Sequence, residues 1–338
     1  MKTLVLTIAM ASGLAAWTPL ASASARSTEV AAAFDRQVAD GLPCDVLLSP
    51  PGTAPQRITV LERLTTHLDF PDGSQGTMYL ARVDGRSASV VRVGERVDVA
   101  VDDDDTPAPA PRMSRYAAGP GAWPWLDGSD LLHMADGEAP DELTELYGGG
   151  DASAEKTLHV WVFLHDRSGE DNYAKFLNWY AAWWIKDMET TVRPGMPIRV
   201  SLRDRIPGLT DLDYHAGKAE KRISDVAVAG ARYVRESGGH VDNLSRFVLF
   251  VADPPRNFPS RVLGGAIEPF RAAIISNRGH RHIFAHEVGH LIGATHEAAE
   301  NRFFCVTNMA DNIIGKAACQ VYTKANDQNI RDYLRARL

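Results

Sequence analysis

Alternation of apolar and polar residues in the first third of the chain predicts short β-strands. Four runs rich in β-branched residues, 57–62, 77–84, 88–93 and 96–101, are separated by Asp-Gly, Gly-Ser and Gly-Glu breaks. Such breaks between alternating runs are typical of tight turns. Residues 26–104 are therefore predicted to form a small antiparallel β unit.

A linker follows this unit. Four aspartates, Asp102 to Asp105, lead into a Pro/Ala run that ends at Pro111, and this composition cannot hold a core. The aspartates could bind calcium, but a solvated linker is the favoured interpretation. Residues 111–155 are rich in Gly and Pro and are assigned to the same linker.

From Leu158 onward the pattern changes to strands that alternate with helices. Residues 158–165 contain too few polar side chains for an edge strand, which predicts a central one. Further strands are predicted at 198–202, 246–252 and 272–276, and helices from near 171, over 223–235 and near 327–337. The first helix carries five large side chains at helical spacing, which favours core packing over a substrate platform: Tyr173, Phe176, Leu177, Tyr180 and Trp184.

The segment from position 286 to 296 reads His-Glu-Val-Gly-His-Leu-Ile-Gly-Ala-Thr-His. On a helix, His286 and His290 lie one turn apart on the same face, so both can bind one metal ion. Glu287 points to one side and is placed to act on a water molecule at the metal rather than to bind the metal. Gly293 can end the helix, because glycine adopts positive φ without a Cβ penalty, and the chain can then bring His296 round as a third ligand.

Three neutral imidazoles leave a fourth position open for water, which is typical of catalytic rather than structural zinc sites. The alternative is three unrelated histidines on an amphipathic helix. The glycine and the third histidine at fixed offsets disfavour it. His280 and His282, which precede the helix, and the histidines scattered elsewhere are predicted not to bind the metal.

This motif resembles the signature of the metzincin clan of zinc endopeptidases. The resemblance implies a Zn²⁺ ion held by His286, His290 and His296, Glu287 as the general base, and Met309 in a methionine turn beneath the metal. Glu297, directly after the third histidine, is similar to astacins. Asp311 departs from that subfamily, which has a tyrosine two residues after the methionine, so the subfamily stays open.

The order of the predicted elements agrees with the resemblance. It implies an α/β (α+β) catalytic domain with a twisted mixed sheet, helices on one side of the sheet, the zinc helix and a small C-terminal subdomain. The expected organisation is a signal peptide at 1–25, a β-rich propeptide at 26–110, a linker at 111–155 and the catalytic domain at 156–338.

Composition and the N-terminus indicate a secreted globular protein. The chain has 338 residues, 45% hydrophobic, with a formal net charge of −7, which argues against nucleic acid as a partner. Residues 4–16 form an apolar run that is too short to span a membrane, and a small-residue stretch follows it. This predicts a signal peptide cleaved after Ala23 or Ala25 and no membrane anchor. The Ala/Arg-rich composition suggests a bacterial protein, extracellular or periplasmic, and a monomer is expected.

Three cysteines in an exported chain leave one without an intramolecular partner. Cys305 and Cys319 flank Met309 and are expected to form a disulfide in an oxidising compartment, stabilising by ~3 kcal/mol. Cys44 lies in the predicted propeptide, and its thiolate could fill the open position on the zinc. A small buried residue is the favoured interpretation of Cys44.

The expected activity is hydrolysis of internal peptide bonds in a protein or peptide substrate, with the substrate extended along residues 264–277. Gly264 and Gly265 could mark a bulge or a turn there. Two alternatives stay open. One is a secreted zinc amidase acting on cell-wall peptide crosslinks, and the other is a zinc-containing binding module without turnover.

Overall fold

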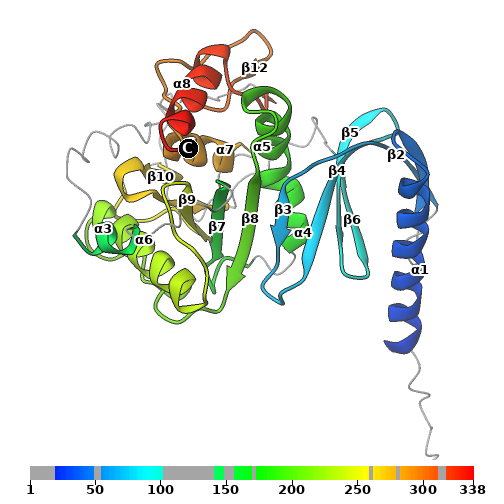
Figure 1. Cartoon of the computed structure of the whole chain (residues 1–338), viewed down its shortest axis with the longest axis horizontal. Coiled ribbons are helices and arrows are strands. Elements are labelled where there is room, and N and C mark those ends of the chain that lie inside the picture. Colours follow the sequence, from blue (N-terminus) through cyan, green and yellow to red (C-terminus); the bar gives the residue numbers. More distant parts are fainter. Residues whose placement is uncertain are drawn as a thin grey trace, which may run out of the picture.

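The computed structural model describes residues 20–48, 55–101, 141–147, 156–169, 173–258, 262–278, 282–310 and 317–338. These residues form a mixed α/β fold built on one large sheet, with a small pair of short strands near the C-terminus (Figure 1). The predicted linker, with Asp102 to Asp105, and most of the predicted signal peptide lie outside the described residues.

The N-terminal unit contains the antiparallel strands expected from the alternating pattern. Its strands are β1 (Cys44–Leu48), β2 (Gln56–Arg63), β3 (His67–Asp69), β4 (Gln75–Val83), β5 (Arg86–Val93) and β6 (Arg96–Val101). Asp84 and Gly85 both have positive φ between β4 and β5, as a two-residue hairpin turn requires. The paired residues Val83 and Arg86 fix the register of that hairpin.

Helix α1 (Leu20–Ala39) precedes these strands and was not predicted. Phe34 is fully buried, and Val30 and Val38, one turn to either side, pack against the same cluster of strand side chains. The four-residue spacing of these three residues is the sequence signal for the helix. The helix begins upstream of Ala23 and Ala25, the predicted cleavage points.

The C-terminal half contributes five strands: β7 (Leu158–Leu164), β8 (Ile198–Asp204), β9 (Ser245–Val251), β10 (Gly264–Ile267) and β11 (Ala272–Ser276). Their spatial order is β8-β7-β9-β11-β10, with β10 antiparallel at the edge and the others parallel. Strand β7 lies between β8 and β9, so the prediction of a central strand is confirmed.

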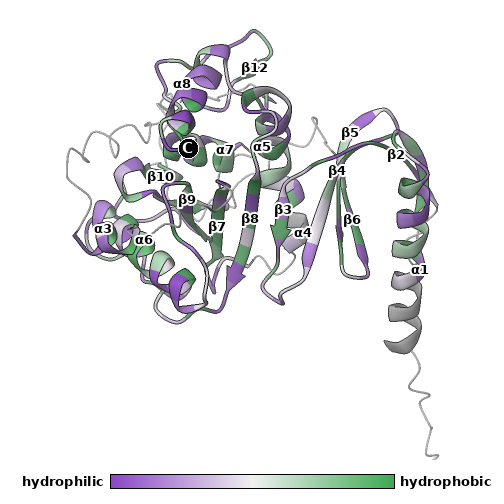
Figure 2. Ribbon diagram, in the orientation of Figure 1, coloured by the Kyte–Doolittle hydropathy of each residue, from purple (hydrophilic) through white to green (hydrophobic). Residues whose placement is uncertain are grey.

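Helices cover both faces of this part of the sheet, so the expectation of helices on one side is wrong. On one face pack α7 (Ile283–Leu291) and a helical run of α4 (Tyr173–Phe176), η1 (Leu177–Ala181), α5 (Ala182–Asp187) and η2 (Met188–Val192). On the other face pack α6 (Ala219–Glu236) and α3 (Asp141–Tyr147). The reason lies in β7, which is apolar on both faces: Val160 and Val162 enter one core, and Trp161 and Phe163 enter the other (Figure 2).

The N-terminal unit and the C-terminal half share one sheet. Strand β3 pairs in parallel with β8, so the strand order runs from β1 to β10 without interruption (Figure 1). At this joint the buried Asp69 accepts hydrogen bonds from Arg199 and from Ser201 Oγ, the latter at 2.7 Å. Burial on its own would raise the pKa of Asp69, but the hydrogen bonds from Arg199 and Ser201, together with the charge of Arg199, lower it overall.

A second contact joins the two parts. The Glu189 carboxylate in η2 accepts hydrogen bonds from the backbone N–H groups of Thr65 and Thr66, both at 2.7 Å, and from Thr66 Oγ1 at 2.6 Å. In η1, the buried Asn178 accepts a hydrogen bond from Ser89 Oγ at 2.9 Å. The predicted boundary between propeptide and catalytic domain is therefore crossed by a continuous sheet, polar contacts and a common core. Removal of the N-terminal segment stays a prediction.

The chain after α7 forms a small C-terminal part. It contains β12 (Cys305–Val306), β13 (Ala317–Ala318) and α8 (Lys324–Arg335). Thr323 caps α8 by accepting a hydrogen bond from Asn326 N at 3.0 Å, and the helix matches the one expected near residues 327–337. None of the described helices is long and apolar enough to cross a membrane.

Candidate metal centre

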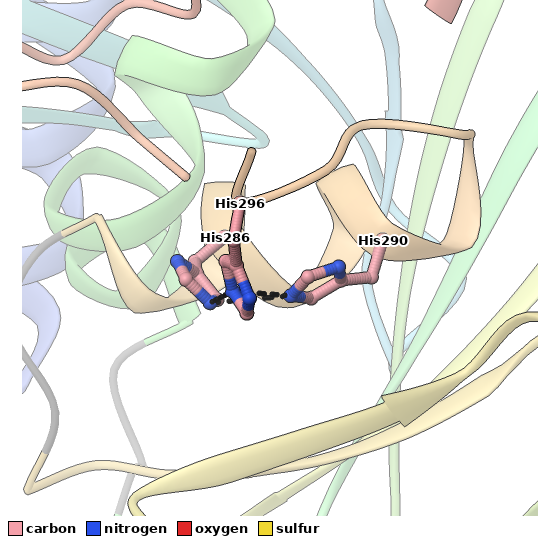
Figure 3. A group of neighbouring side chains, drawn as sticks. All are labelled: His286, His290 and His296. Carbon is pink, nitrogen blue, oxygen red and sulfur yellow. Dashed lines mark hydrogen bonds between the residues drawn. The ribbon is translucent and has the colours of Figure 1, made fainter. Parts of the chain in front are cut away.

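Three imidazoles converge at the zinc-type motif. His286 and His290 lie one turn apart on α7, and His296 comes from the chain that follows the helix (Figure 3). The Nε2 atoms of His290 and His286 are 3.3 Å apart, and His296 Nε2 is 3.0 Å from each of them. Within the described part of the chain, these three residues are the group whose ligand atoms could hold a metal ion.

These separations fit a tetrahedral metal site. Nitrogen ligands about 2.0–2.1 Å from a zinc ion at tetrahedral angles lie roughly 3.3–3.4 Å apart. The observed distances of 3.0 to 3.3 Å are close to that edge length. The donor set is therefore compatible with one ion. His282, 7% exposed just before the helix, is not part of the cluster, and His280 lies outside the described residues.

The surroundings of His286 and His290 suit a role as metal ligands. His286 Nδ1 lies 2.8 Å from the backbone carbonyl of Asn308, which can only accept a hydrogen bond, so Nδ1 carries the proton. Burial, together with the neighbouring imidazoles of His286 and His296, holds the pKa of His290 well below its ordinary value. A neutral imidazole is the form that binds a metal.

The turn that delivers His296 is built around Gly293. Helix α7 ends at Leu291, and Gly293 follows with φ of +92°. The N–H of Ala294 donates to the carbonyl of Gly289 at 2.9 Å, and the N–H of Gly293 donates to that of His290 at 3.3 Å. This is the Schellman arrangement of a helix end. A Cβ at Gly293 would also lie 2.7 Å from Cβ of Tyr333.

A fully buried arginine supports this helix end, and sequence reasoning missed it. Arg246 Nε donates to the Leu291 carbonyl at 2.6 Å, and Nη2 donates to the Tyr333 hydroxyl at 2.9 Å. A cation at the C-terminal end of a helix interacts favourably with the helix dipole. The sequence signal was one charged residue, Arg246, near the start of strand β9, which continues with apolar residues only.

Met309 and Tyr322 pack beneath the zinc-type helix. A Cβ at Gly289 would lie 2.6 Å from Met309 Sδ and 3.0 Å from the Tyr322 hydroxyl, so any other residue here would force Met309 to shift. The Tyr322 hydroxyl donates to the carbonyl of Ala285 on the same helix. Met309 is fully buried, as expected of a hydrophobic floor, and Tyr322 was not predicted.

Replacing Met309 with leucine is expected to be mild. The substitution keeps the side-chain volume nearly constant, so the free energy of unfolding should fall by less than ~1.5 kcal/mol. Zinc content and most of the activity should remain. Urea denaturation measures the stability, metal analysis measures the zinc content, and a peptide assay measures the activity. Loss of zinc from the Met309→Leu protein would assign the sulfur a direct role at the metal.

Glu287 lies between α7 and the edge strand β10. Its side chain is 2% exposed, and a Cβ at Gly264 would lie only 2.7 Å from Glu287 Oε1. Gly264 and Gly265 are regular members of β10, paired with Ile275 and Ile274 of β11. Because this pairing is regular, they form neither a bulge nor a turn. The absence of a side chain at Gly264 allows the strand to approach the carboxylate.

The expected disulfide between Cys305 and Cys319 is present and joins β12 to the residue directly after β13. Cys44 is a half-buried free thiol in β1. Burial and the nearby charges of Asp45 and Asp40 raise its pKa. Because β1 and β10 stand at opposite ends of the sheet, the Cys44 thiol does not reach the histidine cluster in this conformation.

A cavity of about 600 Å³ opens elsewhere, at the carboxyl ends of β7 and β8. None of its lining residues belongs to the histidine cluster: they are Leu164, His165, Asp166, Ser168, Gly169, Tyr173, Asp204 and Arg205. Hydrogen bonds from Arg167 N to His165 Nδ1 and between His165 Nε2 and the Leu212 carbonyl occupy both ring nitrogens of the buried His165. That histidine is therefore a structural residue of the β7 end.

No protein-family model and no curated protein matches the chain. Among solved structures, the fold is similar to the crystal structure of metalloproteinase-II from Bacteroides fragilis, with a TM-score of 0.41 and 14% sequence identity. The match covers 86% of this chain and 91% of that one.

Proposed function

We propose that the protein is a secreted, zinc-dependent endopeptidase of the metzincin type. The observation that carries this proposal is the convergence of two imidazoles from helix α7 and a third from the chain after it, with a buried carboxylate beside the first of them. A structural metal site has no use for such a carboxylate, so Glu287 favours turnover over the alternative of a binding module.

Each residue of the site has a distinct task in this proposal. His286, His290 and His296 would hold the ion, with Asn308 and the turn at Gly293 fixing their orientation. When bound, zinc supplies Lewis acidity and lowers the pKa of water. Glu287 takes a proton from the attacking water and returns it to the leaving amine.

The substrate is proposed to extend along β10. This strand forms the edge of the sheet, and no described strand pairs with its outer side. An extended peptide could therefore add to the edge through main-chain hydrogen bonds. Contact between Gly264 and Glu287 would then bring the carboxylate close to the bound peptide bond.

Export is part of the proposal. The disulfide Cys305–Cys319 supports an oxidising compartment such as the periplasm or the exterior of a bacterium. Zinc rather than another divalent ion is proposed because three imidazoles with an open position are typical of catalytic zinc.

The experiment compares two substrate classes with the exported form, residues 26–338. Casein should be cut at internal peptide bonds, whereas purified peptidoglycan should release no new amino groups. A zinc chelator should abolish casein cleavage, and added Zn²⁺ should restore it. Cleavage of peptidoglycan alone would replace the endopeptidase by a cell-wall amidase. Zinc binding without cleavage of either would leave a binding module.

Gly264→Ala tests the proposed position of Glu287. The new Cβ would lie 2.7 Å from Oε1, so the carboxylate must move. Because a displacement of about 1 Å at a catalytic group can cost ~100-fold in rate, we expect kcat to fall at least tenfold. Zinc content and the melting temperature are the controls and should change little. Unchanged kcat would show that Glu287 does not act from this position.

A further inference from the structure

Two phenylalanines are presented to solvent on a hairpin next to the candidate metal centre. Phe303 and Phe304 are 85% and 79% exposed, and the next most exposed large apolar side chain among the described residues is Leu47 at 57%. Their rings lie 4.6 Å apart in an edge-to-face arrangement. Exposing two adjacent aromatic side chains is unfavourable in water, and such patches mark sites of interaction.

Backbone pairing and a disulfide fix the hairpin that carries this aromatic pair. Arg302 N donates to the Cys305 carbonyl at 2.9 Å, and Asn301 pairs with Val306, so the phenylalanines occupy the two-residue tip. The disulfide to Cys319 anchors the returning strand. Rigid aromatic side chains lose little conformational entropy on binding, which is why they act as binding hot spots.

Both ends of the hairpin connect to the candidate metal centre. It begins at Glu300, four residues after His296, and Thr307 closes it through a backbone hydrogen bond to Glu300 at 3.1 Å. The next residue, Asn308, holds His286 through its carbonyl. Three strand residues span roughly 10 Å, so the tip lies about that far beyond the base of the hairpin.

We infer that Phe303 and Phe304 form a docking element for apolar side chains of the protein substrate that lie outside the residues at the scissile bond. This inference rests on the proposed function and deepens it by naming a substrate class, polypeptides with apolar side chains near the cut. A lipid surface fits less well, because the charged neighbours Glu300 and Arg302 neutralise one another at 2.9 Å and the chain carries a net charge of −7.

Binding to an inactive protein tests the inference separately from catalysis. In the zinc-loaded Glu287→Ala background, fluorescence anisotropy gives Kd for labelled peptides with the same central sequence. One set ends two residues from the centre, and the other extends five residues on each side with either Leu or Ser at the outer positions. We expect the Leu peptide to bind about tenfold more tightly than the Ser peptide, as for a moderate hot spot.

Phe303→Ser/Phe304→Ser should abolish this Leu-over-Ser preference and leave the Kd of the short peptide unchanged. Leu47→Ser is the matched control, since it removes another exposed apolar side chain on β1 and should retain the preference. A preference kept by the double variant, or absent from the parent protein, overturns the inference. So does binding to phosphatidylcholine vesicles, or a dimer in size-exclusion chromatography with light scattering, if the double variant abolishes either.

Cleavage of the Leu peptide by the wild-type protein tests the proposed function separately from the docking element. Wild-type protein that binds the Leu peptide through the phenylalanines but never cleaves it would refute the endopeptidase and leave the docking element intact. Cleavage with no dependence on Phe303 and Phe304 would support the endopeptidase and refute the docking element.

Discussion

Glu287→Ala is expected to keep the metal and lose at least a hundredfold in kcat. The carboxylate is buried beside His286 but is not one of the three converging ligands, so its removal leaves the nitrogen donors in place. A general base contributes typically 10²–10⁴-fold to the rate. Metal analysis paired with a peptide assay measures both effects on the same sample.

Glu236→Ala is the matched control for this experiment. Glu236 is an exposed glutamate at the end of α6, and its replacement should change neither zinc content nor rate. If Glu287→Ala stays near wild-type activity, the assigned mechanism is wrong. If it loses the metal as well as the activity, Glu287 supports the ligands rather than the proton transfer.

Local patterns predicted much of the fold. The β4–β5 hairpin followed from alternating residues around Asp84-Gly85, and β7 followed from an apolar run. The candidate site followed from spacing alone, because a helix places His286 and His290 on one face and Gly293 ends it. In each case the signal and the structure involve residues that are close in the sequence.

Contacts between distant segments were not predictable in this way. Strand β3 has only three residues, and its partner β8 lies about 130 positions downstream. Arg246 and Tyr322 support α7 from β9 and from the segment before α8, and neither belongs to a recognisable motif. The close approach of Gly264 to Glu287 also depends on tertiary packing, so a strand glycine could as easily have indicated a turn.

The N-terminal unit, predicted to be a removable propeptide, shares a hydrophobic core with the C-terminal half. Seven buried side chains of the N-terminal unit belong to the same core as α7: Leu64, Leu68, Phe70, Met78, Leu80, Val91 and Val93. Burial of apolar side chains is the dominant favourable term in folding. Removing the N-terminal unit would expose the side chains of the C-terminal half that pack against these seven.

Residues 140–338 expressed alone, a segment that keeps α3, are therefore expected not to fold cooperatively. Circular dichroism melting and the casein assay, compared with residues 26–338, measure this. Cooperative unfolding of the short form with higher activity than the long form would instead support a removable inhibitory segment, as the sequence suggests.

Glu189→Ala separates these two outcomes without deleting any part of the chain. It removes the acceptor of three hydrogen bonds from Thr65 and Thr66 at the joint. Hydrogen bonds to a charged group contribute about 1.5–3 kcal/mol each at most, so a loss of a few kcal/mol in the free energy of unfolding is expected. If the N-terminal unit is integral, activity per folded molecule stays constant while stability falls. If the unit inhibits the enzyme, the loosened joint raises activity instead.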